Sequence, residues 1–219
     1  MKSGGLKISA SLWSANLAEL GSSLGQVERY CDSFHFDIMD GHYTPTLLFG
    51  PDIVKALRGL TNKPFEVHFM VTQPESLFEQ FIEAGADVFI LHSETCDSII
   101  DTVNRLKSIN KKVGIAIRSE ENCDEVIKLL NMIDYVILMG TEIGIKGVSI
   151  QPNVYEKIKI LRQEIVSNNY NVEIQIDGGI RVDTVPKIYE HGADIITAGS
   201  LLFNNDHEEI FKWVKGLTK

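Results

Sequence analysis

Cysteine and proline are scarce in this sequence, and long apolar runs are absent. The three cysteines, Cys31, Cys96 and Cys123, are widely separated and follow no metal-ligand spacing, so they indicate a reducing compartment rather than a disulfide scaffold. Six prolines and a hydrophobic fraction of 44% exclude a disordered chain. No apolar stretch reaches about 18 residues, and residues 1–6 contain no run long enough for a signal peptide. We therefore expect a cytoplasmic globular protein with no membrane partner.

Basic residues are also few. Lys and Arg number 21 against 30 Asp and Glu, and the net charge is −9. A surface that binds nucleic acid needs clustered Lys and Arg to neutralise phosphates, and no basic patch with interleaved aromatics is found here. We therefore expect no nucleic-acid partner. A small anionic ligand stays open, because a local pocket can be positive within an acidic protein.

Short β-rich runs recur along the chain, and each is followed by a helical pattern. Several runs are apolar almost throughout, which is typical of parallel strands covered on both faces. Eight such units in 219 residues predict an α/β fold, a single (β/α)8 TIM barrel. No linker or change of composition divides the chain, so residues 1–219 are expected to form one domain. The predicted strands are residues 7–12, 34–39, 65–71, 88–92, 113–117, 135–139, 172–176 and 195–198.

An open, doubly wound sheet is the alternative arrangement of alternating strands and helices. Its glycine fingerprint after the first strand is absent, because the chain there reads Ser11-Leu12-Trp13-Ser14. The tripeptide Gly-Ala-Asp occurs at residues 85–87 and 192–194, each time just before a predicted strand. We interpret it as one helix-to-strand turn used twice, with chance repetition as the alternative.

Polar side chains stand where the predicted strands end. His35 and Asp37 lie two residues apart on a buried strand, so they point the same way, and burying both is unfavourable unless something binds them. His68 and Asp177 stand at corresponding places on two other strands. A single buried histidine is more often a satisfied core residue, but four such groups at one rim of a barrel favour a divalent metal such as Zn, Mn, Fe or Co.

Other polar residues near these strand ends receive simpler interpretations. His92 could lie near the metal, but contact with a ligand or plain packing is favoured over ligation. Asp40 and His42 lie in the loop after the second strand, where they would shape the pocket or cap a turn.

Two glycine-bearing turns follow the last two strands. They read Asp177-Gly178-Gly179-Ile180 and Ala198-Gly199-Ser200. Barrels frequently bind a substrate phosphate at these places through backbone N–H groups. Glycines also serve ordinary turns, so each turn alone is weak evidence, but the pair favours a phosphate.

Several of these motifs together resemble the ribulose-phosphate 3-epimerase family, which includes allulose-6-phosphate 3-epimerases. The similarity covers almost the whole chain, and its most specific part is residues 35–45, His-Phe-Asp-Ile-Met-Asp-Gly-His-Tyr-Thr-Pro. The other matching segments are residues 8–16, 67–71, 92–94, 176–179 and 198–200.

The resemblance implies a reaction and roles for the matching residues. His35, Asp37, His68 and Asp177 would bind one divalent metal ion, and the two aspartates would also act as the acid/base pair, one on each face of the substrate. Epimerisation at C3 of a ketose then passes through an enediolate, which the metal stabilises as a Lewis acid. Metal coordination also keeps the aspartates ionised in a dry site. Ser11 would hydrogen-bond near the substrate or Asp37.

The resemblance further implies a sugar-phosphate substrate and a homo-oligomer, either a dimer or a hexamer. Ribulose 5-phosphate and xylulose 5-phosphate are the expected pair, within the pentose phosphate pathway. Three methionines, Met39, Met70 and Met139, would pack beside the planar intermediate, although plain core filling is an open alternative. The expected substrate-binding residues are Ser11, His68, Gly144, Lys146, Gly147, Gly178, Gly179, Gly199 and Ser200.

The segment after the sixth predicted strand departs from the family pattern. The family has a Pro-Gly-Phe-Gly-Gly-Gln type of loop there, which covers the substrate, whereas residues 139–148 read Met-Gly-Thr-Glu-Ile-Gly-Ile-Lys-Gly-Val. Gly144 and Gly147 are retained, the proline, the middle glycine and the glutamine are replaced, and Thr46 stands where the family has asparagine. Three interpretations are open: Lys146 holds the phosphate by its charge, the loop accepts another ketose with or without a phosphate, or efficient catalysis is lost.

Two competing functions give different expectations. Related decarboxylases and aldol-type lyases use a lysine in an Asp-x-Lys-x-x-Asp pattern, but the stretch Asp37-Ile38-Met39-Asp40 has methionine in place of the lysine. A non-catalytic metal-binding barrel would hold a metal without any C3 proton exchange.

Overall fold

The structure, a computed structural model, describes residues 5–217 and is a closed barrel of eight parallel strands surrounded by helices. The strand β1 pairs in parallel with both β2 and β9, which closes the sheet, and the short β3 adds an antiparallel edge to β2. This is the (β/α)8 TIM barrel expected from the sequence. The strands are β1 (Lys7–Ser11), β2 (Ser33–Asp40), β3 (Leu47–Leu48), β4 (Phe65–Met70), β5 (Val88–His92), β6 (Lys112–Ile117), β7 (Tyr135–Met139), β8 (Glu173–Asp177) and β9 (Ile195–Ala198).

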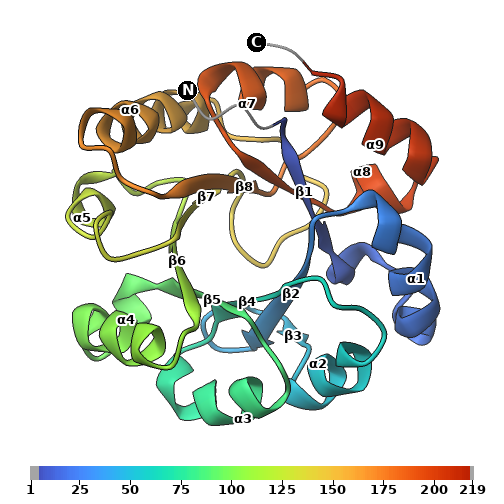
Figure 1. Cartoon of the computed structure of the whole chain (residues 1–219), viewed down its shortest axis with the longest axis horizontal. Helices are drawn as coiled ribbons and strands as arrows, with labels where there is room; N and C mark the ends of the chain where they lie inside the picture. The colour runs from blue at the N-terminus through green and yellow to red at the C-terminus, as the bar shows by residue number, and fades with distance from the viewer. Residues whose placement is uncertain (1–4, 218–219) are drawn as a thin grey trace.

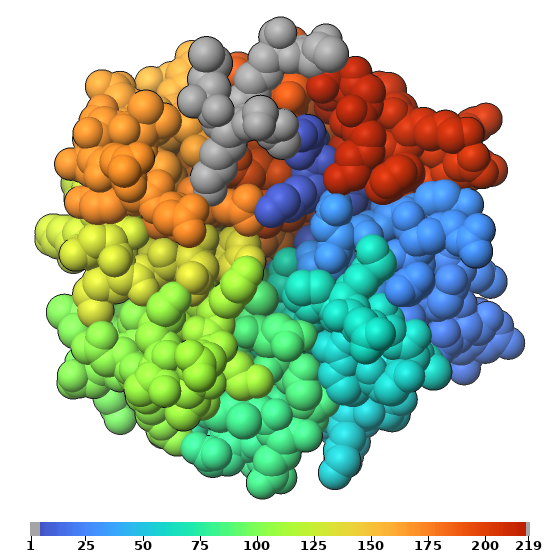
Figure 2. Space-filling view, in the orientation of Figure 1, coloured from blue at the N-terminus to red at the C-terminus, as the bar shows by residue number. Residues whose placement is uncertain are grey.

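Helices form a ring around the strands (Figure 1). Successive units follow one another around the molecule, so the last helix (red) lies beside the first units of the chain (blue) in Figure 2. Within residues 5–217, no helix is long and apolar enough to cross a membrane. The helices are α1 (Leu20–Val27), α2 (Pro51–Arg58), α3 (Phe78–Glu83), α4 (Ile99–Ser108), α5 (Asp124–Ile127), α6 (Asn153–Ser167), α7 (Val185–His191), α8 (Ser200–Phe203) and α9 (His207–Lys215), with 3-10 turns at Leu12–Ser14, Leu17–Glu19, Glu28–Tyr30, Pro74–Leu77 and Ser93–Thr95.

Each barrel strand lies within one residue of its expected bounds. The strand β3 was not expected, because a strand of two residues carries no periodic pattern. The expectation of no signal peptide in residues 1–6 falls mostly on residues 1–4, which lie outside the described residues.

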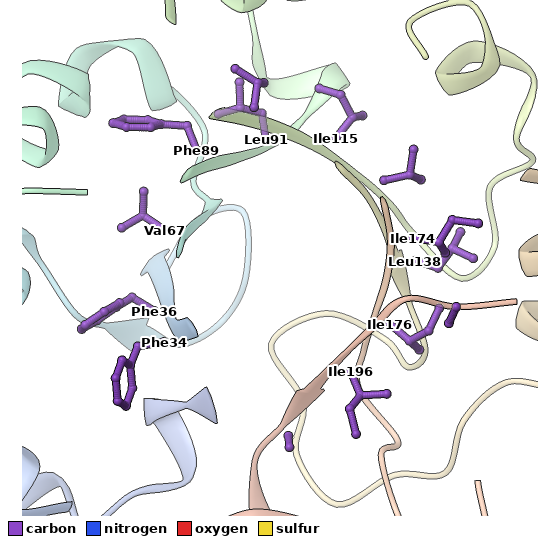
Figure 3. Close-up of a cluster of buried hydrophobic side chains, with 14 of the residues drawn as sticks. Phe34, Phe36, Val67, Phe89, Leu91, Ile115, Leu138, Ile174, Ile176 and Ile196 are labelled. Atoms are coloured by element: carbon purple, nitrogen blue, oxygen red, sulfur yellow. The ribbon is translucent and has the colours of Figure 1, made fainter. Parts of the chain in front are cut away.

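The main hydrophobic core fills the layer between the strands and the helices. Side chains that alternate along the strands point away from the barrel axis into this layer, as Figure 3 shows. The labelled members are Phe34, Phe36, Val67, Phe89, Leu91, Ile115, Leu138, Ile174, Ile176 and Ile196, and all are buried. The residues between them on each strand therefore face the barrel interior.

The barrel interior has an apolar part and a polar part. On β5, β6 and β7 it contains a small apolar cluster made of Val88, Ile90, Ala116, Ile137 and Met139. On β1, β2, β4, β8 and β9 the buried inward residues are mainly polar: Ser9, Ser11, Ser33, His35, Asp37, Glu66, His68, Gln175 and Thr197. This polar part is the candidate binding or catalytic site, because buried polar groups are retained where they are hydrogen-bonded or bind a ligand.

The two Gly-Ala-Asp segments form the same turn, which confirms the expectation that one helix-to-strand turn is used twice. Both glycines have left-handed backbone, with φ of 92° and 114°. In both turns the aspartate accepts a hydrogen bond from a backbone N–H near the start of the neighbouring strand and binds an arginine from an outer helix. The partners are Phe65 and Arg58 for Asp87, and Ile174 and Arg162 for Asp194.

Candidate functional site

Four metal-ligand side chains meet inside the barrel near the carboxyl ends of three strands. The strand β2 carries His35 and Asp37, β4 carries His68, and β8 ends at Asp177. The register of the β2–β4 ladder places Asp37 beside His68. One nitrogen or carboxylate oxygen from each of the four residues lies within 4.8 Å of the others. The fold thus brings together the four residues that the sequence singled out as metal ligands.

The four atoms surround one space and do not form two separate pairs. His35 Nε2 lies 3.4 Å from Asp37 Oδ1 and 3.3 Å from Asp177 Oδ2. His68 Nδ1 lies 3.8 Å and 3.5 Å from the same two oxygens. Each nitrogen is therefore about equally distant from both carboxylates, which is the arrangement of ligands around a common centre.

The residues present fit a divalent transition metal. Within residues 5–217, three of the four facing atoms, His35 Nε2, His68 Nδ1 and Asp177 Oδ2, are buried without a hydrogen-bond partner. Leaving one such group unpaired costs about 1–3 kcal/mol. A cation that binds imidazole nitrogen and carboxylate oxygen would satisfy all three, and two nitrogen and two oxygen donors suit Zn, Mn, Fe or Co.

Burial and charge act against each other in this cluster. Burial lowers the pKa of His35, but the charges of Asp177 and Asp37 outweigh it and hold that pKa well above its usual value. Burial raises the pKa of each aspartate, and the neighbouring His35 outweighs it, so both pKa values lie below the usual range. The cluster therefore keeps two carboxylates ionised and favours positive charge between them, as a metal cation would provide.

Ser11 orients Asp37. Its Oγ donates a hydrogen bond of 3.2 Å to Asp37 Oδ2, while Asp37 Oδ1 faces the two histidines. Ser11 can do this because it ends β1, next to His35 in the register with β2. One carboxylate oxygen is thus directed to the cluster and the other to the hydroxyl group.

A cavity of about 290 Å³ adjoins the cluster, and both Asp37 and Asp177 line it. Their side chains are 7% and 14% exposed. Each carboxylate therefore touches both the candidate metal position and the space where a small molecule can bind. A pair of acid/base groups needs this placement, because each must reach the proton that it transfers.

Most residues expected to contact a substrate line this cavity. His68 and Met39 do not: His68 lies fully buried in the cluster, and Met39 is buried where β2 pairs with β3 and β4. Strand alternation places Met39 on the inward face of β2 with His35 and Asp37, so its role beside a substrate stays a prediction. The expected residues that do line the cavity are Ser11, Met70, Met139, Gly144, Lys146, Gly147, Gly178, Gly179, Gly199 and Ser200.

The atypical segment of residues 140–148 follows β7, and its gold loop is seen inside the ring of strands, near the centre of Figure 1. Lys146 Nζ donates a hydrogen bond of 2.6 Å to the backbone oxygen of Trp13 and lies 4.4 Å from the centre of the Trp13 ring. Burial lowers the pKa of Lys146, and the charge of Asp37 acts in the opposite direction. An ammonium group has three donors, so Lys146 has two more to offer to an anion in the cavity.

Glycine is required where the segments after β7 and β8 touch. A Cβ atom at Gly140 would overlap the backbone oxygen of Gly178, and Gly178 itself has a left-handed φ of 94°. The Gly178–Gly179 turn and the atypical segment therefore lie against each other in the wall of the cavity.

Sequence reasoning missed several residues of the site. Glu66, which contacts His35, lies two residues before His68, so the alternation that linked His35 with Asp37 was an available signal. Trp13 and Ser14 lie in the 3-10 turn that follows β1, at the end of the barrel where active sites form, and position alone could have indicated them. The other missed residues that line the cavity are Thr141, Glu142, Ile145, Val148, Ile180 and Thr197.

His92 and Asp40 lie where the simpler interpretations put them. His92 Nε2 is 3.0 Å from His68 Nε2, so His92 contacts a candidate ligand and is not one of the four. Asp40 accepts hydrogen bonds of 2.8 Å from the backbone N–H groups of His42 and Tyr43 and so caps the turn after β2. Although burial raises the pKa of Asp40, a hydrogen bond from the backbone N–H of Thr72, together with those from His42 and Tyr43, lowers it to about 2.

The fold and the site define a class: a (β/α)8 barrel with a candidate metal centre and a small-molecule cavity at the carboxyl ends of its strands. Comparison with known proteins then gives the family. The model of the "Ribulose-phosphate 3 epimerase family" matches residues 7–203. The chain belongs to the ribulose-phosphate 3-epimerase family.

Curated relatives resemble the chain over most of its length. The chloroplastic ribulose-5-phosphate-3-epimerase of Arabidopsis thaliana is 36% identical over 95% of this chain and 75% of its own. The ribulose-phosphate 3-epimerases of Bacillus subtilis and Methanocaldococcus jannaschii are 31% and 35% identical, over 96% and 92% of this chain and 99% and 86% of their own. These relatives identify the chain as an epimerase, which is an isomerase.

Solved structures of other enzymes share the fold. A 3-keto-L-gulonate-6-phosphate decarboxylase from Vibrio cholerae superposes with a TM-score of 0.73 at 16% identity, over 98% of this chain and 100% of its own. An orotidine 5'-monophosphate decarboxylase from Methanocaldococcus jannaschii superposes with a TM-score of 0.69 at 18% identity, over the same shares. At such low identity the likeness extends to the barrel alone.

Proposed function

We propose that the chain is a metal-dependent ketose-phosphate 3-epimerase that interconverts ribulose 5-phosphate and xylulose 5-phosphate, with residues 1–219 as one catalytic domain. One observation carries the proposal: Asp37 and Asp177 belong to the candidate metal cluster and also line the cavity. The names of the relatives supply the pentulose phosphate as the substrate.

The two aspartates are proposed to move the C3 proton. Epimerisation removes a proton from one face of the substrate and returns one to the other face, so it needs two groups on different sides. Asp37 on β2 and Asp177 on β8 are separated around the barrel by β1 and β9. One aspartate then acts as the base and the other as the acid, and they exchange roles for the reverse reaction.

His35, Asp37, His68 and Asp177 are proposed to hold one divalent ion of Zn, Mn, Fe or Co. When bound, this ion supplies Lewis-acid stabilisation of the negative charge on the enediolate. Met70 and Met139 line the cavity and are proposed to give the planar intermediate an apolar surface to pack against.

The phosphate is proposed to bind between the turns after β8 and β9 and the atypical segment. Gly178, Gly179, Gly199 and Ser200 line the cavity from the first two places. Lys146 lies in the wall formed by the third, with Gly144 and Gly147 allowing left-handed backbone at φ of 73° and 82°. A cation beside glycine turns suits a phosphate, because charge and backbone N–H groups then act together.

Incorporation of solvent deuterium at C3 tests the proposed reaction. The metal-loaded protein is incubated in D2O with a panel of ketoses and ketose phosphates, and the metal content of the same sample is measured. We expect C3 exchange with ribulose 5-phosphate and xylulose 5-phosphate. Absence of exchange with every compound in metal-replete protein would contradict the enzyme proposal and leave a metal-binding barrel as the function.

The same panel tests the alternative substrate. The alternative substrate is allulose 6-phosphate or another ketose with or without a phosphate. It is suggested by the altered sequence of residues 140–148, in which Lys146 is hydrogen-bonded to Trp13. Faster exchange with one of these compounds than with the pentulose phosphates would replace the substrate while keeping the reaction. The homo-oligomer and the cytoplasmic location stay predictions.

Replacing Lys146 with methionine is expected to raise KM for the ketose phosphate by about 10- to 100-fold with a small change in kcat, because a hydrogen bond to a charged group contributes about 1.5–3 kcal/mol. Steady-state kinetics measure the change, and Lys159→Met, on the outer helix α6, is the matched control. For an unphosphorylated ketose, the KM of Lys146→Met should differ little from that of the wild type. An equal loss with both kinds of substrate would show that Lys146 acts by holding the loop on Trp13 rather than by binding phosphate.

A further inference from the structure

Glu66 is a buried carboxylate that the proposed reaction does not use. It lies on β4, two residues before His68, and its exposed fraction is 4%. Because strand side chains alternate, Glu66 and His68 both face the barrel interior. An ionised carboxylate in such a place is strongly unfavourable unless its oxygens are hydrogen-bonded. Its partners therefore indicate why the position carries a glutamate.

Four donors from three other strands surround this carboxylate. Ser33 Oγ lies 2.5 Å from Glu66 Oε1. Three groups lie near Oε2: Ser9 Oγ at 2.8 Å, Gln175 Nε2 at 3.0 Å and His35 Nδ1 at 3.2 Å. The hydroxyl and amide groups hold Glu66 in one position, and the remaining contact connects it to the candidate metal cluster.

The contact with Glu66 decides which nitrogen of His35 is free. An ionised carboxylate only accepts hydrogen bonds, so Nδ1 must carry the proton and the lone pair of the neutral ring lies on Nε2. This Nε2 is the atom that faces Asp37 Oδ1 at 3.4 Å and Asp177 Oδ2 at 3.3 Å, and within residues 5–217 it has no hydrogen-bond partner.

Resting on the metal site proposed above, we infer that Glu66 is a positioning residue that holds His35 in the tautomer and orientation in which Nε2 binds the divalent metal. Glu66 does not touch the metal position. It acts through His35, and its charge strengthens the hydrogen bond and the donor ability of the ring.

The second histidine of the cluster, His68, contacts His92 and not a carboxylate. The proposed effect of Glu66 is therefore confined to His35. The outer nitrogen of His68 lies 3.0 Å from His92 Nε2. A neutral imidazole can either donate or accept, so His92 does not by itself decide the tautomer of His68. The Glu66 carboxylate can only accept a hydrogen bond, so it fixes the tautomer of His35. A substitution at Glu66 should therefore weaken metal binding through His35 alone.

Zinc affinity tests this inference. Wild-type protein, Glu66→Gln and Ser33→Ala are titrated with zinc in competition with a chromophoric chelator. Ser33→Ala is the matched control, because it removes a hydrogen bond to the same carboxylate without touching His35. We expect Glu66→Gln to bind zinc about 10- to 100-fold more weakly than wild type, and Ser33→Ala to change zinc affinity much less.

Nitrogen NMR of histidine-labelled wild-type protein with zinc gives a second readout that needs no variant. We expect His35 to show a metal-bound Nε2 and a protonated Nδ1, whereas a metal-bound Nδ1 would overturn the inference. If Glu66→Gln does not fold, as judged by circular dichroism, this spectrum decides. Equal zinc affinity of Glu66→Gln and wild type, or an equal loss in Ser33→Ala, would overturn the inference alone. Wild-type protein that binds no zinc would overturn both the inference and the proposed metal site.

Discussion

Replacement of Asp177 by asparagine is expected to lower the rate of C3 epimerisation by about 10²- to 10⁴-fold, the contribution of a positioned acid/base group. Asparagine has nearly the same shape as aspartate, so the barrel should stay folded. It cannot accept a proton at the working pH, and it offers the candidate metal a neutral oxygen in place of a charged one. The loss should therefore appear in kcat rather than in folding.

Measuring C3 deuterium exchange of each epimer separately tests whether each aspartate serves one face of the substrate. Because each is proposed to serve one face of the substrate, any residual C3 exchange in Asp177→Asn should be confined to one epimer. The variant Asp37→Asn should retain exchange, if any, with the other epimer. Equal residual exchange of both epimers in either variant would indicate a single base.

Metal content must be measured in the same samples, because both aspartates belong to the candidate metal cluster. Loss of exchange at full metal occupancy assigns the defect to proton transfer. The exposed residue Asp183, which lies six positions after Asp177, provides the matched control Asp183→Asn, and this variant should keep wild-type rates. Wild-type activity in Asp177→Asn would show that the two-aspartate mechanism is wrong.

The barrel and the metal-ligand set could be predicted because both follow from local patterns. Apolar runs of strand length recur at regular intervals, and His35 and Asp37 face the same way by strand alternation alone. The carboxyl ends of parallel strands meet at one end of a barrel, so His68 and Asp177 could be placed beside them before any contact was known.

Features that depend on register and loop closure could not be predicted in this way. The contact of Glu66 with His35 requires the specific register between β2 and β4, which is set by packing of the whole barrel. The contact of Lys146 with Trp13 joins residues 133 positions apart, and no local pattern specifies it. Met39 is buried and does not line the cavity, although strand alternation places it on the same face as Asp37, and no local pattern in the sequence distinguishes it from Met70 and Met139, which do line the cavity.

Removal of the bound metal by a chelator is expected to abolish C3 exchange and to lower thermal stability. A ligand at about 1,000 times its Kd stabilises the folded protein by roughly 4.1 kcal/mol. For a protein of this size, about 1 kcal/mol corresponds to a change in Tm of roughly 2–4 °C. The metal-loaded protein should therefore unfold about 8–16 °C above the chelated protein. Magnesium, which prefers oxygen ligands, should give little of this increase and serves as the control cation.

The increase in Tm should become larger as the pH rises. In the metal-free protein the pKa of His35 lies well above its ordinary value of 6.5, because the charges of Asp177 and Asp37 outweigh burial. Protonated His35 therefore contributes stability that is fully present below pH 6.5 and is lost as the pH rises through the raised pKa. Metal binding needs the neutral ring, so metal affinity increases over the same range. Thermal unfolding with and without metal, recorded from mildly acidic to alkaline pH, measures both effects. A difference in Tm that is absent, or that shrinks as the pH rises, would show that no ion replaces the proton between these carboxylates.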